Sequence, residues 1–133
     1  MSEYRTRMKS FEPYAYVLLR VLAGFLILFH GLDRLFEWPV GYSYNAYDRY
    51  IVGPIVLVGG AMLILGLFTR LAAFLCGAMV MGLYIIENAR DDVLPFINRG
   101  EAHVLFLAAF LFIAAKGGGR LSFDRSRENQ AKD

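Results

Sequence analysis

The stretch YIVGPIVLVGGAMLILGLF, Tyr50 to Phe68, has no charged residue in 19 positions. A helix of about 20 apolar residues spans the hydrocarbon core of a bilayer. A helix on the surface of a soluble protein needs a polar face, and this stretch has none. It therefore predicts a transmembrane helix and argues against a soluble helical bundle.

A second run of spanning length precedes this stretch. Tyr14 to Phe36 is apolar except for four residues, Arg20, His30, Asp33 and Arg34. Polar residues at membrane depth are costly, so they mark either functional sites or paired structural clusters. This run predicts a transmembrane helix that carries the polar residues of greatest interest.

Two shorter uncharged runs follow, Leu71 to Ile86 and Ala102 to Ala115. Each reaches spanning length only with its flanks, as Phe68 to Glu87 and as Arg99 to Gly117. Long end residues can then extend to the headgroups, or the bilayer can thin locally. We therefore predict an all-α protein, a bundle of four transmembrane helices.

Composition narrows the classes of protein. The chain has 133 residues, 57% hydrophobic and 20% charged, with a net charge of +2. This excludes a disordered chain and a basic nucleic-acid binder, and the single cysteine, Cys76, excludes an internal disulfide. The late start of the first apolar run does not fit a cleaved signal peptide. We expect one transmembrane domain, residues 14–116, between tails of residues 1–13 and 117–133.

The loops predict an orientation. Nine basic residues fall on one side of the bundle: Arg5, Arg7, Lys9, Arg70, Lys116, Arg120, Arg125, Arg127 and Lys132. The other side holds four, Arg34, Arg49, Arg90 and Arg99, with the acids Asp33, Glu37, Asp48, Glu87, Asp91, Asp92 and Glu101. The positive-inside rule then places both termini in the cytoplasm.

Small residues predict how the helices pack. Alanine and glycine at four-residue spacing in the third run allow close approach of backbones. The short turn Thr69-Arg70 requires the second and third helices to form an antiparallel hairpin. We expect this hairpin to pack closely through Gly60, Gly66, Gly77 and Gly82.

The first helix carries one polar stripe. At 100° per residue, His30, Asp33, Arg34 and Glu37 fall within about 100° of each other, and Arg20 lies about 80° from His30. We expect Asp33 and Glu37 to compensate the charge of Arg34. Arg20 either extends its charged end toward the cytoplasmic side or belongs to a site.

Further polar residues occur at similar depth on the later helices. Tyr84 and Glu87 share a helix face, and Glu101 and His103 open the fourth helix. His30 and His103 could ligate a haem b, but two histidines alone are weak evidence for haem. A divalent metal would need at least three of the histidines and glutamates to converge, and we predict no metal site.

These segments resemble the DoxX family. LLR at 18–20 followed by HGLDRLF at 30–36 resembles its first-helix signature. Further landmarks, in order and with compatible spacing, are GG at 59–60, LGLFTRLAA at 65–73, GE at 100–101 and GGGRLSFD at 117–124. The likeness spans about Tyr14 to Asp124. Two positions depart from it: Val56 stands where the family often has a glutamate, and Arg34 where lysine is commoner.

The resemblance implies a four-helix protein of bacterial or archaeal inner (cytoplasmic) membranes. The better-understood relatives look like small subunits of redox assemblies, including a thiosulfate:quinone oxidoreductase and a mycobacterial oxidative-stress complex. It therefore implies, at most, a subunit of a quinone-linked oxidoreductase with a quinone-like ligand. A noncatalytic anchor or stabilising partner of a larger complex is the alternative. Protein partners are expected, and homo-oligomerisation stays open.

The candidate site is the polar cluster in the outer leaflet. Its candidate catalytic residues are His30 and Glu101, and its candidate ligand-binding residues are Arg20, His30, Arg34, Tyr84 and Glu87. Acids beside the histidine and arginine would satisfy their charges and leave donors for the carbonyls of a quinone-type head group. The imidazole of His30 is the candidate proton carrier. A purely structural ion-pair cluster is the alternative interpretation.

Overall fold

The computed structural model describes residues 1–90 and 92–133, and the backbone alone of Ser2. Within these residues the chain is helical and contains no strand, so the predicted all-α class is confirmed. Asp91, one of the acids assigned above to the outer side, lies outside the described residues.

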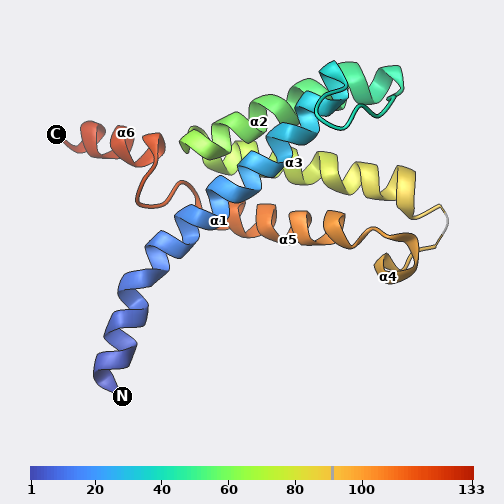
Figure 1. The fold of residues 1–133 in the computed structure, drawn as a ribbon. Helices are drawn as coiled ribbons and strands as arrows, with labels where there is room; N and C mark the ends of the chain where they lie inside the picture. Colours follow the sequence, from blue (N-terminus) through green and yellow to red (C-terminus); the bar gives the residue numbers. More distant parts are fainter. Residues whose placement is uncertain (91) are drawn as a thin grey trace.

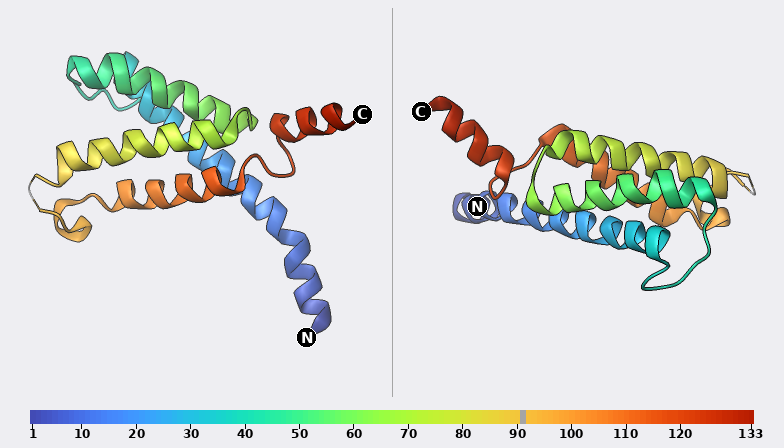
Figure 2. Two further views of the ribbon diagram at one scale, coloured as in Figure 1. Left: turned by 180° about the vertical axis from the view of Figure 1, so that it is seen from behind. Right: turned by 90° about the horizontal axis from the view of Figure 1, so that it is seen from above.

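The helices follow one another as α1 (Ser2–Phe36), the π-helical turn η1 (Asp48–Val52), α2 (Gly53–Leu65), α3 (Thr69–Leu83), the π-helical turn η2 (Tyr84–Asn88), α4 (Pro95–Asn98), α5 (Glu101–Lys116) and α6 (Phe123–Lys132). Four of them pack in the order α1, α2, α3, α5, and α5 returns to contact α1 (Figure 1). Both chain termini leave from one end of this bundle, which we call the terminal end (Figure 2). The loop of residues 37–47 and α4 lie at the opposite end, which we call the loop end.

Three helical segments are long and apolar enough to cross a membrane: Glu3–Phe36, Asp48–Leu65 and Thr69–Asn88. Only 33–39% of the residues in their most apolar windows are buried within the protein. The remaining apolar side chains face outward, as expected of helices that contact lipid. α5 has 16 residues, or about 24 Å of helix, which is shorter than a typical span, so the fourth span remains a prediction.

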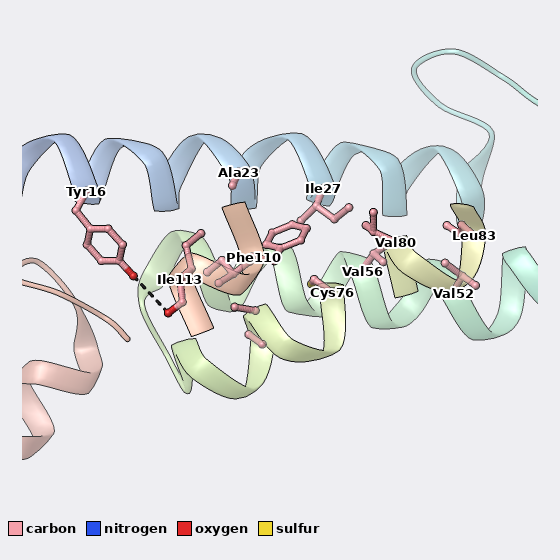
Figure 3. Close-up of a cluster of buried hydrophobic side chains, with 13 residues drawn as sticks. Tyr16, Ala23, Ile27, Val52, Val56, Cys76, Val80, Leu83, Phe110 and Ile113 are labelled. Carbon is pink, nitrogen blue, oxygen red and sulfur yellow. Dashed lines mark hydrogen bonds between the residues drawn. The ribbon is translucent and has the colours of Figure 1, made fainter. Parts of the chain in front are cut away.

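The core lies along the centre of these helices (Figure 3). Leu63, Cys76, Phe110 and Ile113 are completely buried in it. Cys76 is a free thiol and packs as a small apolar side chain.

The closest helix contact is between α1 and α2, and glycines make it. A Cβ at Gly24 would lie 2.9 Å from the Gly60 carbonyl oxygen, and one at Gly31 would lie 2.6 Å from the Leu57 amide nitrogen. The hairpin of α2 and α3 is present, but the prediction that Gly60 packs it was wrong. Gly60 faces α1 because it lies about 100° around the helix from Gly59, whose added Cβ would instead meet Cys76 of α3.

The other glycines assigned to the hairpin also lie elsewhere. Gly77 faces Phe110 on α5, and Gly82 has no atom within 4 Å of an added Cβ. Gly66 ends α2 with a φ of 72°, the left-handed conformation that glycine adopts most easily. The sequence pattern identified small residues correctly, but the spacing alone did not assign each of them to a neighbouring helix.

The C-terminal residues close the terminal end of the bundle. Arg70, in the first turn of α3, donates to the carbonyls of Ala114 (3.2 Å) and Ala115 (2.5 Å) at the end of α5. The Asp124 amide donates to the Gly66 carbonyl at 3.0 Å. The segment after α5 is therefore bonded to the α2–α3 turn.

Candidate functional site

A small cavity of about 40 Å³ lies toward the loop end, between α1, α2, α3 and α5. Its lining residues are Ile27, His30, Arg34, Val56, Val80, Leu83, Ala102, His103 and Phe106. Four of the apolar residues, Ile27, Val56, Val80 and Leu83, gather at one end of the buried core (Figure 3). The volume accommodates a few water molecules.

Arg34 is the buried cation of this cavity. It lies one turn after His30 on α1 and is 6% exposed. Its Cζ lies 5.1 Å from the centroid of the Tyr44 ring, a cation–π contact. Its Nε is buried and has no hydrogen-bond partner among the described residues. Arg34 therefore retains an unused donor inside the protein.

Two histidines lie at the same cavity. Nδ1 of His103, on the first turn of α5, is also buried without a partner among the described residues. His30 is more exposed; its Nδ1 lies 2.9 Å from the Leu26 carbonyl, and its ring stands edge-on to Phe106 at 5.8 Å between centroids. His30 is thus at the rim of the cavity, and His103 lies deeper.

The expected pairing of Arg34 with Asp33 and Glu37 was wrong. Asp33 is buried and accepts hydrogen bonds from the loop that follows α1, including the Gly41 amide (2.8 Å) and the Tyr44 hydroxyl (2.7 Å). Burial of Tyr44, its own hydrogen bond to Asp33 and the negative charge of that carboxylate raise the pKa of Tyr44 to about 12. Glu37 pairs with Arg49 instead. Both acids therefore bond to the 37–49 segment and not to Arg34: Asp33 accepts from backbone and hydroxyl donors of the loop, and Glu37 pairs with the guanidinium of Arg49.

The remaining loop-end candidates surround the cavity without lining it. The hydroxyl of Tyr84 donates to the Val93 carbonyl at 2.7 Å and accepts from Asn98 at 3.1 Å, so it is engaged by the segment between η2 and α5. Glu87 and Glu101 are exposed, and their side chains make no hydrogen bond or ion pair within the described chain. Glu87 nevertheless interacts electrostatically with Arg34.

Arg20 lies away from this cluster. It is buried at the terminal end, where its guanidinium donates to the carbonyls of Gly118, of Leu121 at 2.6 Å and of Ile64 at 3.5 Å. Ten residues of helix separate it from His30, about 15 Å along the axis. Its local role is to hold the segment after α5 against α1.

The structure thus brings together His30 and Arg34 from the predicted set, and it adds two residues. His103 was noted for its depth in the membrane but was not placed in the site, because periodicity does not show which face of α5 meets α1. Val56, noted only as a departure from a family pattern, forms part of the apolar wall. No group of three or more His, Cys, Asp or Glu able to hold a metal occurs among residues 1–90 and 92–133.

The volume of the cavity limits how much of a quinone could enter it. Its volume of about 40 Å³ is too small to enclose a quinone ring. Arg34 Nε donates, and His103 Nδ1 donates in the tautomer that carries its proton there, so each can bond an acceptor oxygen such as that of a carbonyl group or a water molecule. The residues present therefore fit the polar end of a quinone, and the small volume leaves no room for its ring.

Comparison with known proteins finds two distant relatives of similar length. A Haemophilus influenzae protein named "Uncharacterized protein" is 29% identical over 125 residues, which cover 88% of this chain and 93% of the relative. A Bacillus subtilis protein named "Putative oxidoreductase CatD" is 28% identical over 124 residues, which cover 87% of this chain and 88% of the relative. No family model matches the chain, and no solved structure matches it. The chain is therefore similar, over nearly its whole length, to bacterial proteins of which one is named as an oxidoreductase.

Proposed function

We propose that this chain is a small subunit of a membrane oxidoreductase and that its loop-end cavity receives the carbonyl oxygen of a quinone-type ligand. One observation carries the proposal: Arg34 Nε and His103 Nδ1 are both buried without partners at one cavity. Nearly all buried polar groups in proteins are hydrogen-bonded. Two buried nitrogens without partners at one cavity therefore favour a bound molecule that supplies an acceptor. The name of the Bacillus subtilis relative and the resemblance to the DoxX family support the redox assignment.

The proposal assigns roles to the chain's own residues. Arg34 and His103 hold the acceptor oxygen at the buried side of the cavity, where the low dielectric strengthens hydrogen bonds. His30, at the rim beside Phe106, is the candidate to pass a proton to or from the ligand. Glu101, exposed at the start of α5, is the candidate to exchange that proton with water. The ring of the ligand remains outside the cavity, because the volume of about 40 Å³ is too small for it.

The proposed membrane location follows from the apolar helices and the distribution of charge. α5 serves as the fourth span, with Arg99 and Lys116 at its ends extending to the headgroups. Residues 14–116 then form the transmembrane domain. The nine basic residues of the terminal end support cytoplasmic termini in a bacterial or archaeal inner membrane. The cavity then lies in the outer leaflet.

The small volume of the cavity favours a second candidate function, a noncatalytic partner that anchors or stabilises a larger complex. A few water molecules inside the cavity would satisfy Arg34 and His103, and no organic ligand would then be required. In that case the polar cluster would contribute only to folding.

Binding of a short-chain ubiquinone to the purified full-length chain in lipid nanodiscs tests the proposal. We expect Arg34→Met to remain folded and to lose bound quinone, because methionine keeps the apolar stem of the side chain and removes the donors. Val56→Phe should also lose quinone, because the larger ring fills the cavity. Arg49→Gln is the matched control: it removes an arginine at the same end that does not line the cavity, and it should retain binding.

The outcomes separate the two functions. Quinone bound to the wild-type chain and to Arg49→Gln but lost from Arg34→Met supports the site. A folded Arg34→Met variant with full quinone occupancy overturns it. Co-purification of larger subunits with a wild-type chain that binds no quinone supports the noncatalytic partner and also overturns the ligand site.

A further inference from the structure

The N-terminal part of α1 extends beyond the bundle. α1 is one helix of 35 residues from Ser2 to Phe36, and its first turns project away from the other helices in Figure 1 and in the left view of Figure 2. The ion pair between Glu12 and Lys116, at 3.2 Å, marks the level at which α1 meets the end of α5. Residues 2–11 therefore form a helical extension about 15 Å long, which we call the N-terminal extension.

The N-terminal extension is amphipathic. Tyr4, Met8 and Phe11 recur at spacings of four and three, which places them on one face of the helix. They are 71%, 54% and 63% exposed, so no other part of the described chain covers them. Large apolar side chains in such a row are expected to be covered by lipid or by another protein.

This apolar face continues along the membrane part of α1. The same spacing of four and three leads from Phe11 through Ala15 to Leu18, Leu22 and Phe25. Leu18, Leu22 and Phe25 are exposed, and at membrane depth their surroundings are the acyl chains. The face that the extension presents is thus the lipid-facing side of its own helix.

Pro13 lies on the opposite face of the helix. It is nine residues after Tyr4, about 180° around the axis. Its ring crowds the carbonyl four residues earlier, that of Lys9, and it lacks the amide that would bond there. A helix opens on the side of such a proline and bends away from it. The favoured bend is therefore toward the apolar face, which brings that face down onto the bilayer.

The charges of the extension complement an anionic membrane. Arg7 flanks the apolar face on one side, and Arg5 and Lys9 lie on the other, against the single acid Glu3. Long basic side chains beside an apolar face place their stems in the interface and their charges among the headgroups. Each basic residue near an anionic leaflet adds to the attraction.

We propose that residues 2–11 form an interfacial anchor that lies on an anionic phospholipid surface, with Tyr4, Met8 and Phe11 inserted between headgroups and Pro13 as the bend. This inference goes beyond the ligand site and does not depend on it. Its occupant is the lipid leaflet; a partner protein or a second copy of the chain would cover the same face without lipid contact.

A single tryptophan introduced into the extension of the full-length chain tests the anchor. Trp38→Phe first removes the native tryptophan of the loop end. Phe11→Trp then reports from the apolar face, and Ser10→Trp, on the adjacent polar face, is the matched control. Each is measured in vesicles of phosphatidylcholine with phosphatidylglycerol, and in the same vesicles containing brominated lipid, which quenches tryptophan on contact.

We expect a blue shift and strong quenching for Phe11→Trp, and neither for Ser10→Trp. In phosphatidylcholine alone, or after Arg5, Arg7 and Lys9 are all replaced by glutamine, quenching of Phe11→Trp should fall. Equal quenching at both positions would overturn the anchor. A blue shift of Phe11→Trp without quenching would also overturn it, because protein rather than lipid would then cover the face. Quinone occupancy should be unchanged in every variant.

Discussion

Asp124 on α6 caps the first turn of α3 through Thr69. Its Oδ2 accepts from the Thr69 amide at 2.8 Å and from the Thr69 hydroxyl at 2.6 Å, while Oδ1 accepts from the Phe68 amide at 2.8 Å. The first amides of a helix have no partner within the helix. Here the partner comes from a residue 55 positions later in the chain, so the C-terminal segment is an integral part of the bundle.

Replacing this cap should destabilise the protein. We expect Asp124→Ala to lower the free energy of unfolding by about 1–2 kcal/mol, in the range of other helix caps. The comparison is thermal unfolding of purified protein in detergent at pH 7. Glu128→Gln, an exposed acid on the same helix, is the control and should unfold with the wild-type chain.

The same cap predicts a pH dependence. Burial opposes ionisation of Asp124, but the bonds from Thr69 and Phe68 outweigh it and hold the pKa of the carboxyl below its usual range. A lowered pKa in the folded state means that the stabilisation is complete above about pH 4, the value of an unfolded aspartate. It is lost as the pH falls through the lower folded value. The stability difference between the wild-type chain and Asp124→Ala should therefore shrink between pH 5 and very acid pH, and a constant difference would contradict the cap.

Glycine substitutions should distinguish the close helix contact from open surface. We expect Gly60→Ala to cost about 1–3 kcal/mol, the usual range for overpacking, because its Cβ would lie 2.7 Å from the Gly24 carbonyl oxygen and the Leu28 amide nitrogen. Gly82→Ala meets nothing within 4 Å and should be neutral or slightly stabilising. Thermal stability of the two variants in the same detergent checks this; equal values would show that α1 and α2 are not in close contact.

Arg20 should matter for folding and not for ligand binding. Arg20→Gln removes most of the donors that hold the carbonyls of Gly118 and Leu121, so we expect a marked loss of thermal stability. Because Arg20 lies about 15 Å along α1 from the cavity, quinone occupancy per folded molecule should be unchanged. The exposed Arg120 in the same loop is the control, as Arg120→Gln. A stable Arg20→Gln variant that has lost the ligand would place Arg20 in the site after all.

Topology reporters should decide whether α5 spans the membrane. A reporter enzyme that works only in the cytoplasm should be active when it is fused after Asp133. A reporter that works only outside the cytoplasm should be active when it is inserted within residues 40–43. If α5 did not cross, the C-terminus would share the side of the 92–98 segment. Activity of an exterior-only reporter after Asp133 would exclude the four-span arrangement.

Much of the fold was predictable because lipid imposes a simple rule on sequence. An uncharged run of about 20 residues has few alternatives to a membrane helix, and α2 with η1 and α3 with η2 end within a few residues of the predicted bounds. α1 was predicted from Tyr14 and begins at Ser2. The difference arises because hydropathy detects only the apolar part of a helix, and the first turns of α1 contain charged residues.

The site was predictable only in part. Periodicity placed His30 and Arg34 on one stripe, and they do share the cavity. Periodicity failed for Asp33. The hydrogen-bond donors to this carboxylate belong to an irregular loop, and helical periodicity does not predict the path of a loop. It also failed for Arg20, whose acceptors are backbone carbonyls, and the sequence pattern carries no information about which carbonyls are free.

The bonds of Arg20 also set an order of events during biosynthesis. Arg20 and its acceptors Gly118 and Leu121 are 98 and 101 residues apart, so most of the chain is synthesised between them. Synthesis proceeds from the N-terminus to the C-terminus, so α1 is made well before those carbonyls exist. Until Gly118 and Leu121 have been made, the guanidinium lacks both of these acceptors. Of the bonds described above, a nascent chain that stops before Gly118 therefore leaves Arg20 only the longer one, to the Ile64 carbonyl.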